Sequence, residues 1–498
     1  MGMENIEHVV VVMFENRSFD NLLGWLYDNT TNPPKFNIPP QSPTNFDGLT
    51  AGTYFNVLDA ATKVFASHPG TPWPSCPNPN QNPTPDPQEE FDNVTYQIFG
   101  TALPAKTDPA NMSGFLTDYA TTDAGLASAK QIMQTFGPDE ANVINDIARN
   151  FAVCDRWFAS VPSQTWPNRG FVHTGSSDGH VNNDLYEWYH IPTIFNVLQD
   201  SGKSWGIYSA SSVTPSLTYW QLPYLGGYRA NVCNYSDFKT LCSAAADPAT
   251  KKLPAYSFVE PRFNAELLGV EQPNDYHPPH NICRGEQFLA DVYGAVRNSP
   301  YRDKIMLVIL FDEHGGCYDH VPPPNGAIAP LPCPVSRDGT FNFDRFGVRV
   351  PAIVVSSYVE PSTVFRSSPG EQPFDHTSIL STLRDWLRLK GGPAPFLPSP
   401  RITAAPTLDR VLTRAKGNEN TAWPEIIAKC TIDGKDVSPN TPLNDVQKSL
   451  LVATKVENEN ADHVPTAKQV QSLQTYADAD AFLAPGPMPG SAPAPQLA

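Results

Sequence analysis

The stretch HVVVVMF at residues 8–14 is an unbroken apolar run that stops abruptly at ENR, residues 15–17. A continuous β-branched run of this length is typical of a strand buried on both faces of a parallel sheet. Two further runs have the same character: KIMLVILF at 304–311, which stops at DEH, and VPAIVV at 350–355. Together they predict the central strands of one sheet.

Helix-like amphipathic patterns lie between and after these runs, at residues 128–135, 140–150, 193–201, 286–298 and 377–389. Buried strands that alternate with amphipathic helices predict an α/β fold, with a doubly wound, mostly parallel sheet and helices on both of its faces. In that architecture ligands bind at the carboxyl ends of the strands.

The positions of the prolines and of the later polar segments predict how the chain is organised into a domain, its loop insertions and an appendage. Among its 52 prolines, clusters at residues 32–44 and 69–87 predict loop insertions without strands or helix interiors. We expect a catalytic domain over residues 1–392. Polar helix-like segments at 443–456 and 464–482 then predict a C-terminal helical appendage over 393–484, followed by a disordered tail at 485–498.

The charge balance limits the partners. Thirty-four Lys and Arg face 51 Asp and Glu, a net charge of −17, which excludes non-specific nucleic-acid binding and disfavours anionic lipids. No apolar run is long enough to span a bilayer, so at most peripheral membrane contact is expected. No signal peptide is visible; we expect a secreted or periplasmic protein if one was removed, and a cytoplasmic one otherwise.

The eight cysteines form no C-x-x-C pair. Local disulfides between Cys233 and Cys242 and between Cys317 and Cys333 are one reading. Free buried thiols are an equally good one.

Two of the predicted strands end in oxygen ligands, Glu15 with Asn16 and Asp312 with Glu313. Because parallel strands bring their carboxyl ends to one edge, these side chains could together hold a divalent cation. The alternative is that the acidic residues only cap the helices that follow.

Residues 161–170, VPSQTWPNRG, offer a hydroxyl nucleophile in Thr165 or Ser163. Asn168 and Arg169 beside it suit phosphate oxygens. Hydroxyls before a Pro-Asn pair are also ordinary turn formers, and His173 nearby is as easily a core residue as a catalytic one.

Histidines recur in DYHPPH at 275–280 and DEHGGCYDH at 312–320. A histidine could protonate a leaving group, while the prolines make plain loops an alternative. The pair Gly315-Gly316 would allow a sharp turn beneath the ligands. In DHTS at 375–378 we favour a helix N-cap over a catalytic hydroxyl.

Four motifs in order, ENRSFDNLLGW at 15–25, TWPNR at 165–169, DYHPPH at 275–280 and DEHGGCYDHVPPP at 312–324, carry a family resemblance. The chain resembles, over about residues 6–390, the phosphoesterase family that contains bacterial phospholipases C, plant non-specific phospholipases C and an acid phosphatase. This resemblance implies an alkaline-phosphatase-like α/β fold and one divalent metal ion, with calcium, magnesium, manganese, zinc and iron all open.

The resemblance also implies roles for individual residues. Thr165 would be the nucleophile and a metal ligand, His277 would match a histidine of the phosphate site, and His314 also falls in a family motif. The other metal ligands would be Glu15, Asn16, Asp312 and Glu313. Family members often carry D-P-G-H where this chain has Asp86-Pro87-Gln88-Glu89, so Glu89 replaces a histidine that faces the substrate phosphate.

These residues predict a metal-dependent phosphoric ester hydrolase of phospholipase C type. It would cleave the headgroup phosphodiester of a phospholipid through a phosphothreonine intermediate. An acid phosphatase that acts on small phosphate monoesters is the alternative, and an inactive binding protein on the same fold is a third reading.

Overall fold

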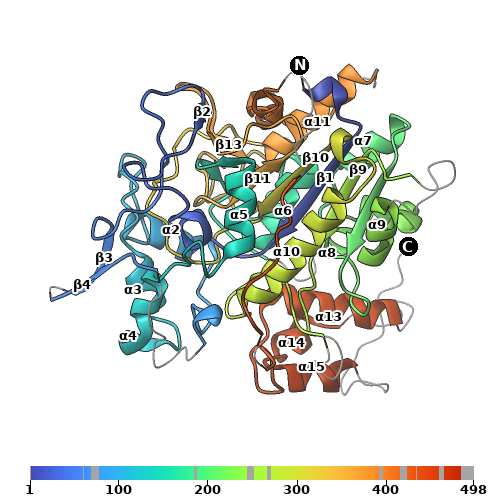
Figure 1. The fold of residues 1–498 in the computed structure, drawn as a ribbon. Helices are drawn as coiled ribbons and strands as arrows, with labels where there is room; N and C mark the ends of the chain where they lie inside the picture. Colours follow the sequence, from blue (N-terminus) through green and yellow to red (C-terminus); the bar gives the residue numbers. More distant parts are fainter. Residues whose placement is uncertain are drawn as a thin grey trace.

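The centre of the computed structural model is a nine-stranded sheet, counted over the residues that the structure describes (Figure 1). These are residues 2–59, 61–68, 78–183, 188–243, 252–265, 271–391, 396–414, 423–432, 434–458 and 465–483. The strand order is β2 (Phe36–Ile38), β12 (Thr363–Phe365), β5 (Ala152–Cys154), β11 (Ala352–Val355), β10 (Ile305–Phe311), β1 (His8–Phe14), β9 (Tyr256–Glu260), β7 (Trp205–Ser209) and β8 (Val232–Asn234).

The two longest strands, β1 and β10, form the middle of the sheet. They run parallel, with Phe14 opposite Phe311, and every residue in both is buried. Apolar side chains on both faces explain why these runs do not alternate with polar residues. The predicted central strands and the α/β class are confirmed.

One predicted strand differs in direction. The run at 350–355 forms β11, which pairs antiparallel with both β10 and β5, whereas the other pairs in this sheet are parallel. No helix is assigned between β10 and β11. The chain leaves the sheet at the carboxyl end of β10 and enters it again at the same side as β11. The two strands therefore run antiparallel.

Helices cover both faces of the sheet. The connections that pass through α9 (Tyr235–Cys242) and α10 (Ile282–Arg297) run in one direction along the strand order, and α10 contacts both α9 and α5 (Asn142–Asn150). The connection through α6 (Thr165–Thr174) and α7 (Ile194–Asp200) runs the opposite way, so right-handed crossovers place it on the other face. There α6 contacts α7 and also α11 (Thr377–Leu389).

Most predicted helices are confirmed, with different ends. The segment 128–135 forms a 3-10 turn at Ala129–Met133, and α10 begins at Ile282, earlier than expected. The segment 464–482 divides into α14 (Ala467–Gln471) and α15 (Tyr476–Leu483), because Asp478 accepts hydrogen bonds from the backbone N–H groups of Gln474 and Thr475 and starts a new helix there. Other elements are α1 (Phe19–Leu23), β6 (Trp157–Phe158), α8 (Leu217–Gln221), α12 (Pro400–Ala404), β13 (Phe374–Asp375) and α13 (Asp445–Asn458).

The first proline-rich insertion was wrongly predicted to lack strands. Residues 36–38 form β2, an edge strand beside β12, because the prolines at 33, 34, 39 and 40 flank it without entering it. Of the second insertion, residues 69–77 lie outside the described residues, and Pro79–Gln81 form a 3-10 turn.

The chain between the two insertions and after the second builds a smaller layer beside the sheet. Its elements are β3 (Phe55–Asp59), β4 (Thr62–Phe65), α2 (Phe91–Phe99), α3 (Phe115–Tyr119) and α4 (Gly125–Ser128). They enclose a second apolar core that includes Ile98, Leu116 and Met133.

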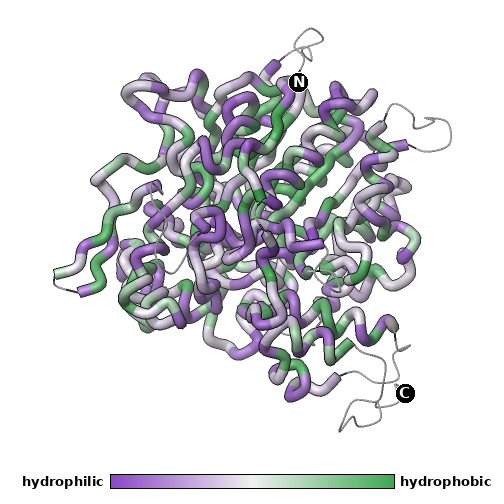
Figure 2. The backbone as a smooth tube through the Cα atoms, turned by 60° about the horizontal axis from the view of Figure 1, so that its bottom comes forward, coloured by the Kyte–Doolittle hydropathy of each residue, from purple (hydrophilic) through white to green (hydrophobic). Residues whose placement is uncertain are grey.

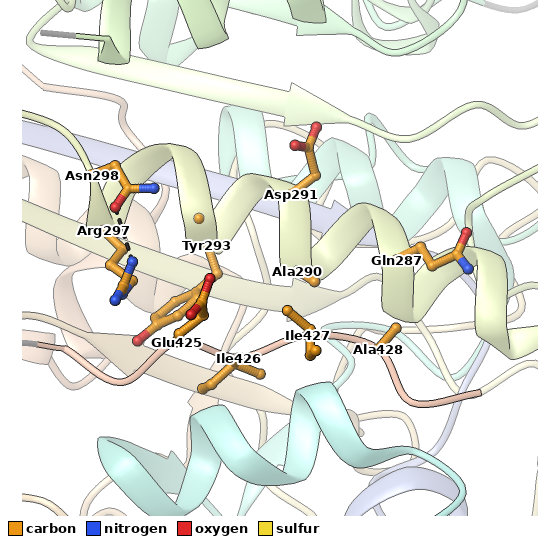
Figure 3. Close-up of a pocket in the computed structure, with 11 residues that line it drawn as sticks. Gln287, Ala290, Asp291, Tyr293, Arg297, Asn298, Glu425, Ile426, Ile427 and Ala428 are labelled. Atoms are coloured by element: carbon orange, nitrogen blue, oxygen red, sulfur yellow. Dashed lines mark hydrogen bonds between the residues drawn. The ribbon is translucent and has the colours of Figure 1, made fainter. Parts of the chain in front are cut away.

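A C-terminal strap, residues 423–432, runs along α10. The Arg297 side chain donates to the carbonyl of Trp423 at 2.9 Å, and the Tyr293 hydroxyl donates to that of Pro424 at 2.8 Å. Figure 3 shows Ile426 and Ile427 of the strap beside α10, where they line a groove of about 340 Å³. The helices α13, α14 and α15 then gather at the bottom of Figure 1.

The disulfide joins Cys430 of the strap to Cys283 at the start of α10. The predicted local bridges are wrong, since Cys233, Cys242, Cys317 and Cys333 are all free. The domain limits at 392 and 484 stay a prediction, and the tail at 485–498 lies outside the described residues. In the described part of the chain, no helix has the length and apolarity needed to cross a bilayer.

Because this disulfide closes a loop of 147 residues, its loss increases the entropy of the unfolded chain. We expect Cys430→Ser to lower the free energy of unfolding by about 2–4 kcal/mol in urea titrations. Cys233→Ser removes a free, half-buried thiol and is the matched control. Equal stability of the two variants would contradict the prediction.

Candidate active site

The carboxyl ends of β1 and β10 place four polar residues next to one another. Since Phe14 lies opposite Phe311, Glu15 and Asn16 leave the sheet beside Asp312 and Glu313, and all four are fully buried. The backbone N–H of Asn16 donates to the Asp312 carboxylate at 3.1 Å.

The predicted glycine turn lies directly beneath these residues. Gly315 and Gly316 have φ angles of 59° and 63°, and a Cβ atom at Gly315 would lie 2.3 Å from the backbone carbonyl oxygen of Asn16. Only glycine allows this approach, so the turn lets the segment after β10 pack closely against Asn16.

Thr165 lies beside Glu15 and Asn16, although it belongs to the layer of helices that contains α6 and α7. It is the first residue of α6, and its Oγ1 lies 3.3 Å from Glu15 Oε2 and 3.4 Å from Asn16 Oδ1. The N-terminal end of a helix carries a partial positive charge, which favours an anionic group there. Thus a hydroxyl, a carboxylate and an amide converge from two elements that are 150 residues apart.

Arg169 is buried against the strand-end carboxylates, and its predicted substrate-binding role stays a prediction. One turn after Thr165 on α6, its guanidinium lies 2.5 Å from Glu15 and 3.3 Å from Asp312. The Asn168 amide is hydrogen-bonded to backbone groups of Val161, Ser163 and Gln164. The Arg169 and Asn168 side chains therefore both stabilise the structure around the site. The order of residues along the chain does not predict these contacts.

Glu89 and His277 complete the cluster on the side of Asn16. The Asn16 Nδ2 atom donates to Glu89 Oε2 at 2.5 Å and lies 2.9 Å from His277 Nε2. With Asp86, whose carboxylate lies 3.5 Å from His277 Nδ1, these residues also form a compact group of possible metal-binding atoms. Sequence reasoning named Glu89 and His277 but gave Asp86 no role.

Burial and crowding shift the acid–base equilibria of the cluster. Burial raises the pKa of Glu15 well above its usual value, and the neighbouring Asp312 adds to this although Arg169 opposes it. Burial likewise raises the pKa of Glu89 and Glu313, with further contributions from nearby carboxylates. Burial, assisted by His280, lowers the pKa of His277 to about 3. A bound cation would relieve the repulsion between these carboxylates.

The donors fit a hard divalent cation. Glu15, Asn16, Asp312 and Glu313 offer carboxylate and amide oxygens, which calcium, magnesium and manganese prefer. The Glu313 Oε1 atom is buried and has no hydrogen-bond partner, which is the condition expected of a ligand atom awaiting an ion.

His314 lies beside this set, on the side of the smaller layer. Its Nε2 is 2.7 Å from the Gln97 amide oxygen and its Nδ1 is 3.3 Å from Glu313. Its catalytic role stays a prediction. His173, by contrast, packs against Phe195 and Phe258 and is a core residue.

A second charged network next to the site was not foreseen. Arg349 is ion-paired with Asp20 and Asp319, and His320 lies 2.6 Å from Asp20. Because the guanidinium already balances both carboxylates, this group is a structural ion-pair network. Asp319 and His320 belong to a quoted motif, but no local spacing identifies Arg349 as their partner.

This network makes stability depend on pH. Although burial lowers the pKa of His320, Asp20 and Asp47 outweigh it and raise the pKa to about 9. The folded state therefore binds a proton more tightly than the unfolded state, so this contribution to stability is complete below about pH 6.5 and is lost as the pH rises through 9. We expect the Tm difference between wild type and His320→Gln to narrow over that range. Parallel Tm curves from pH 5.5 to 10 would contradict this.

Comparisons with known proteins identify what this chain is similar to. The sequence matches the Phosphoesterase family over residues 6–390. Non-specific phospholipase C3 of Arabidopsis thaliana is 33% identical over 478 residues, which cover 92% of this chain and 83% of that protein. Phospholipase C B of Mycobacterium tuberculosis is 25% identical over 426 residues, 77% of this chain and 73% of that protein. A solved alkaline phosphatase superfamily protein from Vibrio parahaemolyticus aligns with a TM-score of 0.29 and 10% identity, covering 56% of this chain and 64% of that one.

Proposed function

The chain belongs to the phosphoesterase family and is a hydrolase of phosphoric esters, and from this premise we propose that it acts as a phospholipase C. Its substrate would be a phospholipid, cleaved between the glycerol oxygen and phosphorus. The convergence of Thr165 Oγ1 with Glu15 and Asn16 at the carboxyl edge of the sheet carries this proposal.

The reaction starts at Thr165. A single divalent ion held by Glu15, Asn16, Asp312 and Glu313 would supply positive charge to the phosphoryl oxygens and lower the pKa of the Thr165 hydroxyl. The threonine oxygen attacks phosphorus, the bond to the glycerol oxygen breaks, and a phosphothreonine forms. His277 Nε2 takes up the threonine proton and passes it to the leaving diacylglycerol oxygen.

Water completes the cycle. It attacks the phosphorus of the phosphothreonine, the bond to Thr165 Oγ1 breaks, and the phosphorylated headgroup leaves. His277 Nε2 takes a proton from the attacking water and passes it to Thr165 Oγ1, which restores the hydroxyl. Arg169 holds Glu15 and Asp312 in place throughout, since both contacts are fully buried.

Charge at the site supports a diester substrate over a monoester. Glu89 and Asp86 lie next to His277 where the phosphate would bind. A phosphomonoester is close to a dianion at neutral pH and is repelled by these acids more strongly than the monoanionic diester. Replacement of a histidine by Glu89 therefore supports the phospholipase over the acid phosphatase.

A paired assay tests the proposal. We expect p-nitrophenylphosphorylcholine to be hydrolysed with a higher kcat/KM than p-nitrophenyl phosphate between pH 5 and 9. Glu89→Gln should raise the relative rate on the monoester, because it removes a carboxyl group that repels the dianion when it is ionised. Preference of the wild type for the monoester at every pH would make it a phosphatase instead.

A chain of hydrogen bonds connects the C-terminal helix α13 to His277. The Gln447 side chain on α13 donates to His280 Nε2 at 3.3 Å, so the ring proton is on Nδ1, which donates to Asp275 at 2.7 Å. The same Asp275 oxygen accepts the backbone N–H of His277 at 3.1 Å. Gln447 is therefore a positioning residue for His277.

Gln447→Glu reverses the polarity at His280 Nε2 while keeping the side-chain size. We expect kcat on the soluble diester to fall about tenfold with KM nearly unchanged, because only the position of His277 changes. The control is Gln474→Glu, on the exposed surface of the same helical appendage. Equal kcat values for the two variants would contradict this role.

The Cys283–Cys430 disulfide supports the secreted or periplasmic location, because disulfides persist in oxidising compartments.

A further inference from the structure

The β3–β4 hairpin stands apart from the main sheet. It is a separate two-stranded antiparallel ribbon in which Phe55 pairs with Phe65 and Val57 pairs with Lys63. Figure 1 shows it projecting from the left side of the molecule, and Figure 2 shows hydrophobic stretches along it.

One face of the hairpin holds it to the protein. The side chain of Asn56 is buried and bonds to the carbonyl of Met112 and the N–H of Leu116. Leu58 and Val64 pack against the second apolar core. This face cannot turn outward, because its backbone partners belong to other elements.

The opposite face is apolar and exposed. Phe55, Val57 and Phe65 are 41%, 45% and 40% exposed, although apolar residues on a two-stranded ribbon usually alternate toward a core. The Lys63 ammonium lies over this face, 3.4 Å from the ring centre of Phe55 and 4.8 Å from that of Phe65. Among the described residues, no carboxylate forms an ion pair with Lys63. We call Phe55, Val57, Lys63 and Phe65 the hairpin face.

The hairpin is attached near the site. Tyr54, at its base, packs against His320 with ring centres 3.9 Å apart and the ring planes tilted by 36°. His320 lies in the segment that leaves the carboxyl end of β10, the strand that delivers Asp312 and Glu313. The hairpin is therefore fixed to the same edge of the sheet as the candidate active site.

We propose that the hairpin face docks the enzyme on the surface of a zwitterionic phospholipid bilayer. The choice of a bilayer rests on the proposed function, because a phospholipase meets its substrate there. The phenylalanine and valine side chains enter the acyl boundary, while Lys63 stays at the level of the lipid phosphates, with which its charge is complementary. The net charge of −17 repels anionic membranes, so apolar insertion supplies the affinity.

Vesicle flotation tests this docking surface. The full chain is mixed with phosphatidylcholine vesicles, and the bound fraction is compared for wild type and the double variant Phe55→Thr/Phe65→Thr. Threonine keeps the strand preference but removes the aromatic area. We expect the partition coefficient to fall about tenfold or more. Ile427→Thr is the matched control, since Ile427 is 66% exposed beside α10 (Figure 3) and should leave binding unchanged.

Hydrolysis of soluble p-nitrophenylphosphorylcholine separates this proposal from the proposed function. We expect the double variant to keep wild-type activity on it while losing activity on vesicles. Vesicle binding without any diester hydrolysis would overturn the phospholipase assignment alone. The docking proposal would be overturned if the double variant bound vesicles as well as wild type does, or if wild type did not bind them. It would also be overturned if wild type were a dimer in solution and the double variant a monomer. If the double variant loses soluble activity, Lys63→Glu replaces it, with the same expected loss of binding.

Discussion

Thr165→Ala is expected to lower kcat on p-nitrophenylphosphorylcholine by about 1,000-fold or more. The methyl side chain cannot attack phosphorus, so the two-step route through a phosphothreonine is closed. Because Thr165 makes only long contacts, 3.3 and 3.4 Å, with Glu15 and Asn16, its loss leaves the ion pairs of Arg169 intact and the Tm close to that of wild type.

Two further variants sharpen this result. Thr165→Ser keeps a hydroxyl at the start of α6 and should retain measurable turnover. Ser163→Ala removes the other candidate hydroxyl, which is hydrogen-bonded to the carbonyl of Val181, and should leave kcat within about threefold of wild type. Near wild-type activity in Thr165→Ala would remove the nucleophile assignment. A peptide in which Thr165 carries the phosphorylcholine group, detected by mass spectrometry after acid quenching, would support it directly.

Arg169→Met is expected to lower the free energy of unfolding by about 3–5 kcal/mol in the metal-free protein. The guanidinium is fully buried between Glu15 and Asp312, and an apolar side chain of similar length would leave both carboxylates uncompensated. Added divalent ion should recover part of this loss, because it supplies the missing positive charge. Urea titrations with and without the ion measure both effects.

The matched control for Arg169 is Arg156→Met. Arg156 pairs with Asp47, but its side chain is 48% exposed, so water already screens the pair and the expected loss is below about 1 kcal/mol. If Arg169→Met raised KM without changing stability, Arg169 would be a substrate ligand, as its place in the motif first indicated.

The amino-acid sequence alone was enough to predict the central strands of the sheet and the residues at their ends. The apolar runs of β1 and β10 have no polar face, so they can be accommodated only inside a sheet that is covered on both faces. That placement in turn predicts that Glu15, Asn16, Asp312 and Glu313 leave the sheet at one edge, which the register of β1 and β10 shows, while their role as metal ligands stays a prediction.

Pairings between distant residues could not be predicted in the same way. The contacts of Arg169 with Glu15, of Gln447 with His280 and of Arg349 with Asp20 and Asp319 depend on the angles at which helices and loops pack. Neither secondary-structure propensity nor the spacing of residues along the chain predicts those packing angles. The antiparallel direction of β11 was missed for a related reason, since an apolar run reads the same in either direction.

What the sequence by itself determined is therefore the class of fold, the strand ends that bring the acidic residues to one edge, and the family of the reaction, because these follow from local hydrophobic pattern and from contiguous motifs. Only the tertiary structure decided that Arg169 neutralises carboxylates, that Cys283 pairs with Cys430 and that the hairpin face remains uncovered. Such features depend on the free energy of contacts between segments far apart in the chain, and this becomes defined only when those segments pack together.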